Sequence, residues 1–275
     1  MLDKLKFPIL NDVNDYDKSN RGALEFNTYN LQQYTIFFVL PVVWLVLLLL
    51  HNKLSIMPVP KGNVESTLLF RILELLFSKL GFLWLILRPI SILISIIVSS
   101  FMAFFFHASF VHVFGNIIVY IICVMLCLWF NLKVDVFFKQ LISFSFFGIA
   151  IPWLSIYFIG FILSKIQITK NWLVVVSNSN IPIVGASVGL FGLLGLFVII
   201  TFMNLGRSRW NSLILIFLGV LTFALLGQQV LNYMDLSTHI TLKAATNILV
   251  VVMHFMGYIL GLIYGFSNRF RFIIK

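Results

Sequence analysis

The sequence contains apolar runs about as long as a membrane is thick. Stretches with few charges occupy residues 35–51, 110–130, 137–163, 186–204, 211–230 and 247–267. A helix of roughly 20 apolar residues crosses the hydrocarbon core of a bilayer. Lipid offers no hydrogen bonds, so a crossing segment must satisfy its backbone internally, as a helix does. These runs predict an all-α membrane protein built as a bundle of six transmembrane helices.

Composition and charge support this class. Of the 275 residues, 61% are hydrophobic and 10% are charged, whereas a soluble domain has about 25% charged residues. The net charge of +10 comes from cations between the apolar runs, where lysine and arginine anchor helix ends at lipid headgroups. We therefore expect a multi-pass protein of the cell membrane, with the lipid bilayer and not nucleic acid as its partner.

The cations also predict orientation, because short loops rich in lysine and arginine favour the cytoplasm. This rule puts residues 131–138, residues 205–210 and the C-terminus inside. His107 and the segments before Ser187 and His254 then lie on the outer side. The expected organisation is a polar cytoplasmic segment at 1–34, a membrane domain at 35–268 and a basic cytoplasmic tail at 269–275.

The segment between the first two runs is predicted to be a long, partly membrane-embedded loop. Residues 64–79 alternate leucines with charges, which is typical of an amphipathic helix lying on a membrane. Residues 81–106 are apolar, but Arg88-Pro89 interrupts them, and proline breaks helices. We favour the loop for this reason. The alternative is that 81–106 forms another full span, which moves the cations before it to the inside.

A serine lies at the start of one apolar run, in Gly185-Ala186-Ser187-Val188-Gly189. Glycines at 185, 189 and 192 recur on one helix face, which lets a neighbouring helix approach closely. Such faces commonly indicate packing alone, and a serine in a span commonly bonds to its own helix. The serine becomes informative only with a partner.

That partner is a histidine within the last run. His254, Gly257 and Gly261 recur at i, i+3 and i+7 and so share a helix face. An ionisable side chain inside a span is a functional hypothesis by default. Two small-residue faces that pack together could bring the Ser187 hydroxyl within reach of the His254 imidazole, as in an activated nucleophile.

Polar side chains also cluster at the start of the run that begins near residue 110. His112 and Asn116 are one helical turn apart, and His107 comes slightly earlier, nearer water. The structural interpretation is a snorkelling His107 and a satisfied polar pair. The functional interpretation is a set of donors for a developing oxyanion, a role that suits asparagine because it donates without titrating.

The scarcity of carboxylates narrows the chemistry. After Glu74 the only acids are Asp135 and Asp235, which we expect in loops. This argues against a triad with an acid, an aspartyl pair or an acidic proton relay. There is no His-Glu-x-x-His sequence, so a zinc protease is not indicated. We expect neither a metal nor another cofactor.

Residues 100–267 resemble the rhomboid intramembrane serine proteases. The resemblance rests on His107-x4-His112-x3-Asn116, Gly185-Ala186-Ser187 and His254-x2-Gly257-x3-Gly261, in that order. It implies Ser187 as nucleophile and His254 as general base. It further implies an oxyanion hole from the Ser187 N–H, His112 and Asn116, and an aromatic, here Phe191, stacked on the histidine.

Two features depart from the family pattern. Val188 follows the serine where the family often has glycine, and the family's Trp-Arg pair is absent, with Trp84 and Arg88 the nearest candidates. The resemblance implies hydrolysis of a peptide bond in or near the transmembrane segment of a membrane protein substrate. The alternatives are a catalytically inactive relative that binds membrane clients and a small-molecule transporter.

Overall fold

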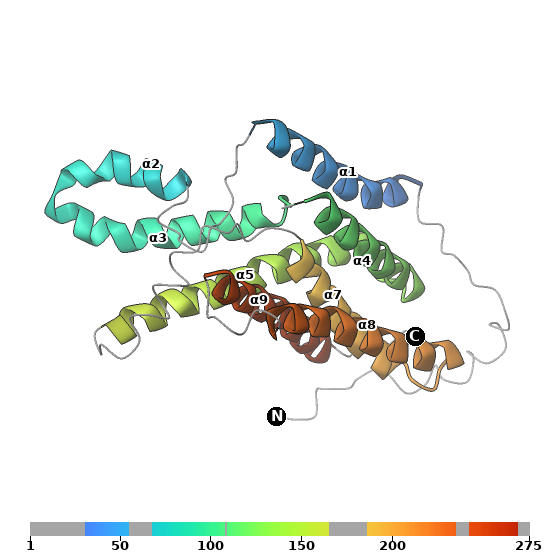
Figure 1. The fold of residues 1–275 in the computed structure, drawn as a ribbon. Helices are drawn as coiled ribbons and strands as arrows, with labels where there is room; N and C mark the ends of the chain where they lie inside the picture. Colours follow the sequence, from blue (N-terminus) through green and yellow to red (C-terminus); the bar gives the residue numbers. More distant parts are fainter. Residues whose placement is uncertain (1–30, 55–67, 108, 165–185, 235–241, 269–275) are drawn as a thin grey trace, which may run out of the picture. The chain divides into compact units, whose positions relative to one another are not determined.

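The computed structural model describes residues 31–54, 68–107, 109–164, 186–234 and 242–268. All regular structure in these ranges is helical, which confirms the all-α prediction (Figure 1). The α-helices are α1 (Leu31–Leu54), α2 (Leu68–Phe77), α3 (Phe82–Ala103), α4 (Phe110–Trp129), α5 (Val134–Ser164), α7 (Ser187–Met203), α8 (Arg209–Met234) and α9 (Leu242–Ser267). The contacts discussed below belong to one compact unit, Val39–Lys275.

Five of the described helices are long and apolar enough to cross a membrane. The five segments are Phe82–Ala103, Phe110–Trp129, Val134–Ile156, Arg209–Gln228 and Leu249–Ser267. Thr35–Leu50 and Ser187–Met203 are apolar but shorter. These helices support a multi-pass membrane protein. Asp135, expected in a loop, instead lies in the first turn of α5.

Helix α3 departs from the prediction that Arg88-Pro89 breaks its run. The helix is continuous from Phe82 to Ala103 with Pro89 inside it. Proline removes one backbone hydrogen bond and clashes with the preceding turn, but apolar residues on both sides favour helix in lipid. Membrane helices therefore tolerate a proline that would end a soluble helix.

A tight reversal joins α3 to α2. The helix α2 lies within the range predicted to be amphipathic, and a 3₁₀ turn at Ser78–Leu80 leads to Gly81. Gly81 has φ of +58°, a backbone conformation that favours glycine. The rings of Phe70 and Trp84 then lie 6.2 Å apart across the reversal, so α2 and α3 form a helical hairpin.

Helix α7 lies at the centre of the packing. It contacts α4, α5, α8 and α9, and most of its side chains are buried. The closest of these contacts is with α9, whose glycines turn towards α7. A Cβ at Gly257 would overlap the Val188 carbonyl, and one at Gly261 would overlap the Gly192 carbonyl. The two backbones approach closely because these positions lack side chains.

The glycines of α7 divide between two neighbours. A Cβ at Gly189 would collide with Leu141 of α5, and one at Gly192 with Phe144 of α5. At Gly195, in contrast, a Cβ would collide first with α9, at the carbonyl of Tyr258. The prediction that Gly189 and Gly192 form the face towards the histidine helix is therefore wrong in part, since both mainly admit α5.

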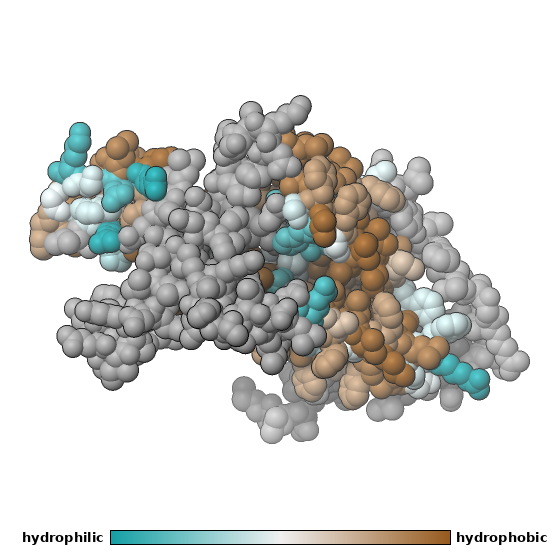
Figure 2. Space-filling model, in the orientation of Figure 1, coloured by the Kyte–Doolittle hydropathy of each residue, from teal (hydrophilic) through white to brown (hydrophobic). Residues whose placement is uncertain are grey.

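Large apolar side chains cover much of the outside of the helices. Figure 2 shows hydrophobic residues over most of the coloured surface in this view. On α8, Val220 is 64% exposed and Phe223 is 80% exposed. Soluble proteins rarely present such contiguous apolar surface, whereas lipid tails cover it without cost.

Candidate active site

Ser187 is the first residue of α7, and its position follows from the start of that helix. The helix begins after the buried Ala186, whose carbonyl accepts the first hydrogen bond from Leu190 N–H at 3.0 Å. Amide groups in a first helical turn lack intrahelical acceptors, and the helix dipole is positive there. Ser187 is half-buried. Gly185 lies outside the described residues.

His254 lies within α9, and its side chain meets Ser187. The His254 Nε2 atom is 2.7 Å from Ser187 Oγ, a hydrogen-bond distance. This agrees with the roughly 2.6–3.5 Å expected for a serine next to its base. The imidazole is 5% exposed, so the pair is shielded from bulk water on the histidine side.

The second ring nitrogen of His254 has no acid to orient it. Its Nδ1 is buried and forms no well-defined hydrogen bond with a described residue, although the carbonyl of Val250 lies near the ring one turn earlier. Among the described residues the arrangement is thus a pair of side chains and not a triad.

Phe191 packs beside the imidazole. It follows Ser187 by four residues, so both lie on one face of α7. The rings of Phe191 and His254 are 4.8 Å apart at an interplanar angle of 53°. The predicted proximity is therefore present, with the rings tilted and not stacked. This contact restricts the orientation of the imidazole.

Ser109 sets the start of α4, which carries the remaining candidates. Its backbone is extended, and its hydroxyl accepts a hydrogen bond from His112 N–H at 3.2 Å. This is an N-cap, which satisfies one of the unpaired amides of a first turn. Sequence reasoning missed Ser109, although a serine before an apolar run is a recognised start signal.

Asn116 and His112 follow the cap within two turns. Asn116 is 6% exposed, and its Nδ2 group is buried without a hydrogen-bond partner among the described residues. His112 is half-buried. A buried unpaired donor is unfavourable by about 1–3 kcal/mol. Asn116 therefore offers an N–H group that an incoming oxygen would satisfy.

His107 is buried, contrary to the prediction of a side chain nearer water. It is 1% exposed and packs against Trp44, with ring centres 5.1 Å apart, and His112, at 5.5 Å. Neither ring nitrogen forms a well-defined hydrogen bond with another described residue, though the Phe105 backbone lies near. Burial, with a smaller effect of His112, lowers the pKa of His107 to about 3.

Trp44 shapes this region without having been singled out from the sequence. Its ring is fully buried and also contacts Phe104 and Tyr120, at centroid distances of 6.0 and 5.7 Å. One tryptophan in an apolar run gives no signal of such a role, because contacts between distant segments decide it. His107 is accordingly a packing neighbour of His112.

The described residues contain no group of three or more histidine, cysteine or acidic side chains able to hold a metal ion. Cys123 and Cys127 are both buried free thiols. Comparison with protein-family models, curated proteins and solved structures gave no match to this chain. The functional argument therefore depends on the geometry of the site and on the sequence motifs.

Proposed function

We propose that this protein is an intramembrane serine protease of the rhomboid type. The observation that carries the proposal is the 2.7 Å contact between Ser187 Oγ and His254 Nε2. These side chains come from helices 67 positions apart in the chain. A nucleophile within hydrogen-bond reach of a base is the arrangement required for acyl transfer.

The reaction would run in two halves. Ser187 Oγ bonds to the peptide carbonyl carbon as its proton passes to His254 Nε2. The imidazolium then protonates the leaving amine as the C–N bond breaks, which leaves an acyl-enzyme. Water attacks that ester, His254 accepts the water proton, and the proton returns to Ser187 as the acid product leaves.

The tetrahedral intermediates carry negative charge on the former carbonyl oxygen. Three groups are proposed to stabilise it: the Ser187 N–H, His112 and Asn116. The first-turn position of Ser187 and the unpaired Nδ2 of Asn116 support this assignment. No metal is needed for the step, because preorganised donors stabilise an oxyanion directly.

The proposed bundle contains the six transmembrane helices α1, α4, α5, α7, α8 and α9, and α3, which is also long enough to span, is proposed to cross the membrane in addition to them. Its substrates are proposed to be membrane proteins cut in or near a transmembrane segment, since the reacting pair lies among apolar helices. A peptide bond in an intact helix is shielded, so segments that unwind easily are the expected class.

The test is covalent labelling of the detergent-solubilised protein with a fluorophosphonate. We expect a mass addition on Ser187, and cleavage of a reporter transmembrane substrate by the same preparation. Ser187→Ala should lose both activities with its thermal midpoint nearly unchanged. A folded wild-type protein that is neither labelled nor active would favour the inactive client-binding relative.

A further inference from the structure

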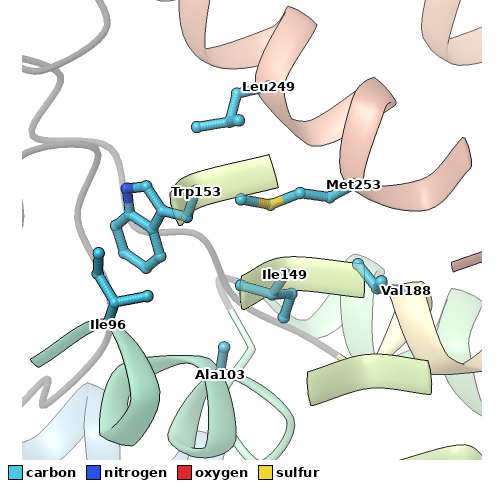
Figure 3. Close-up of a cluster of buried hydrophobic side chains, with 7 residues drawn as sticks. All are labelled: Ile96, Ala103, Ile149, Trp153, Val188, Leu249 and Met253. Atoms are coloured by element: carbon cyan, nitrogen blue, oxygen red, sulfur yellow. The ribbon is translucent and has the colours of Figure 1, made fainter. Parts of the chain in front are cut away.

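Val188, the residue after the proposed nucleophile, is part of a buried cluster beside the site. It is 4% exposed and packs with apolar side chains of α3, α5 and α9 (Figure 3). The other members are Ile96, Ala103, Ile149, Trp153, Leu249 and Met253. Met253 directly precedes His254 in the chain. The cluster therefore connects the neighbour of the serine to the neighbour of the histidine.

Two glycines make the space that the Val188 side chain occupies. A Cβ added at Gly148 on α5 would lie 2.5 Å from Val188 Cγ1 and 3.2 Å from the backbone N and Cα of Gly257, so Val188 Cγ1 is the atom that it meets most closely. A Cβ at Gly257 on α9 would lie 3.0 Å from the same atom and would overlap the Val188 carbonyl. The 2.5 Å contact at position 148 and the overlap with the carbonyl at position 257 are both too close for a real Cβ, so both positions must be glycine while Val188 keeps its place. Val188 thus fills a slot between two helices.

The slot is adjacent to the reacting atoms on both helices. Val188 is one residue from Ser187, which is about 100° around α7. Gly257 is three residues from His254 and shares its face of α9. A rotation of α7 that moved Ser187 away from His254 would push Val188 against the backbone of α5 or α9.

We propose that Val188 is a positioning residue, which holds α7 at the rotation where Ser187 Oγ meets His254 Nε2 by seating its side chain between Gly148 and Gly257. The inference deepens the proposed function, because it takes Ser187 and His254 as the reacting pair. It also accounts for a departure from the family pattern. Val188 is larger than the glycine that often follows the serine in the family, and Gly148 on α5 leaves room for its side chain.

A purely structural role makes a different prediction. If Val188 only fills space, its variants lower the stability of the fold and leave the turnover of the folded enzyme intact. If Val188 positions the serine, kcat falls while KM changes little, because the substrate still binds. A misplacement of about 1 Å in a catalytic group can lower the rate about 10²-fold.

The experiment compares Gly148→Ala, Val188→Ala, the double variant and Val188→Thr. Gly148→Ala should lower kcat about 10²-fold, because its methyl group collides with Cγ1 and turns α7. Val188→Ala alone should lower kcat, because it leaves the slot empty. Added to Gly148→Ala, it removes Cγ1 and should restore part of kcat, because the methyl group at position 148 then occupies the slot. Val188→Thr keeps the branched shape and should retain kcat despite some loss of stability from its buried hydroxyl. Ile200→Val, in the far half of α7, is the matched control and should lower stability alone.

A second readout does not need protease activity. The ¹⁵N resonances of the His254 ring, assigned with His254→Ala, report the hydrogen bond to Ser187. This signature should disappear in Gly148→Ala and return in the double variant. If the wild-type protein shows the signature but cleaves no substrate, the proposed function fails. The positioning inference is then judged from the spectra of Gly148→Ala and the double variant alone. A wild-type signature and wild-type kcat in Gly148→Ala, or no recovery in the double variant, would overturn the inference.

Discussion

At the scale of single residues, the site depends on a few buried polar atoms that have no hydrogen-bond partner among the described residues. The imidazole of His254 has Ser187 on one side and Phe191 against its ring. The side-chain amide of Asn116 has donors that no described residue satisfies. In low-dielectric surroundings an unpaired donor interacts strongly with any charge that develops nearby. We therefore expect these residues to act on the transition state more than on the ground state.

Replacement of Asn116 tests the oxyanion assignment. We expect Asn116→Ala to lower kcat on the order of 10²–10³-fold with a small change in KM, because one oxyanion donor typically contributes that much. The measurement is steady-state cleavage of a reporter transmembrane substrate. A loss confined to KM, or one that follows a large fall in thermal midpoint, would instead assign Asn116 a structural role.

The burial of His107 predicts how stability depends on pH. The unfolded chain protonates this histidine below pH 6.5, whereas burial keeps the folded pKa at about 3. The unfolded state thus binds more protons between these values, and stability is full above pH 6.5 and falls as the pH drops. At pH 5 the loss is about 2 kcal/mol.

His107→Phe should remove this acid sensitivity while keeping an aromatic ring against Trp44. The measurement is the thermal midpoint of both proteins between pH 8 and pH 4. We expect the wild-type midpoint to fall more steeply than that of the variant below pH 6.5, so that the difference between the two midpoints changes with pH. Parallel curves would show that another group causes the acid loss.

At the scale of helices, the site exists because α7 and α9 approach closely. Gly261 follows His254 by seven residues, and its missing side chain leaves room for the Gly192 carbonyl. Gly261→Ala should force the helices apart and lower both activity and thermal midpoint. Gly219→Ala on α8 is the matched control, because a Cβ there meets nothing within 4 Å and alanine favours helix by about 1 kcal/mol. Equal effects of the two changes would contradict the packing argument.

A hydrogen-bond network stabilises the C-terminal end of α7, opposite to the end that carries Ser187. Asn211 donates to the Asn204 carbonyl at 2.7 Å and accepts from Trp129 Nε1 at 3.4 Å. Asn211→Ala should lower stability by about 1–3 kcal/mol, because buried partners lose their hydrogen bonds. We expect kcat to remain unchanged, because Ser187 is the first residue of α7 and this network lies beyond the last of its 17 residues. A fall in kcat at full folding would show that the network also positions the site.

Most helices, the Ser187–His254 pair and the proximity of Phe191 to the imidazole could be predicted from the sequence, whereas the continuity of α3 and several other packing partners could not. Apolar length predicts a helix, and equal spacing on a face predicts which residues point together. Neither apolar length nor spacing shows which of several helices a face contacts. Gly189 and Gly192 were therefore expected to face α9, although they lie against Leu141 and Phe144 of α5. The burial of His107 likewise depends on Trp44, more than 60 positions away. The slot for Val188 could not be predicted either, because it depends on Gly148, which lies on a third helix, α5.

At the scale of the whole molecule, the course of α3 determines how many times the chain crosses the membrane. Helix α3 is continuous and apolar over 22 residues, which is enough to span. It ends at Ala103, a few residues before α4 starts on the side expected to face outwards. If α3 crosses, the turn at Ser78–Leu80 lies in the cytoplasm, and Lys79 then obeys the positive-inside rule.

Cysteine accessibility in intact cells tests this topology. Because α3 has the length of a span, we expect Lys79→Cys to react with a membrane-permeant thiol reagent and not with an impermeant one. Val111→Cys, at a position 83% exposed near the start of α4, should react with both, and Arg207→Cys only with the permeant reagent. The native Cys123 and Cys127 are fully buried and give little background. Labelling of Lys79→Cys by the impermeant reagent would put the α2–α3 hairpin on the outer side, as the embedded loop first expected from Arg88-Pro89 requires.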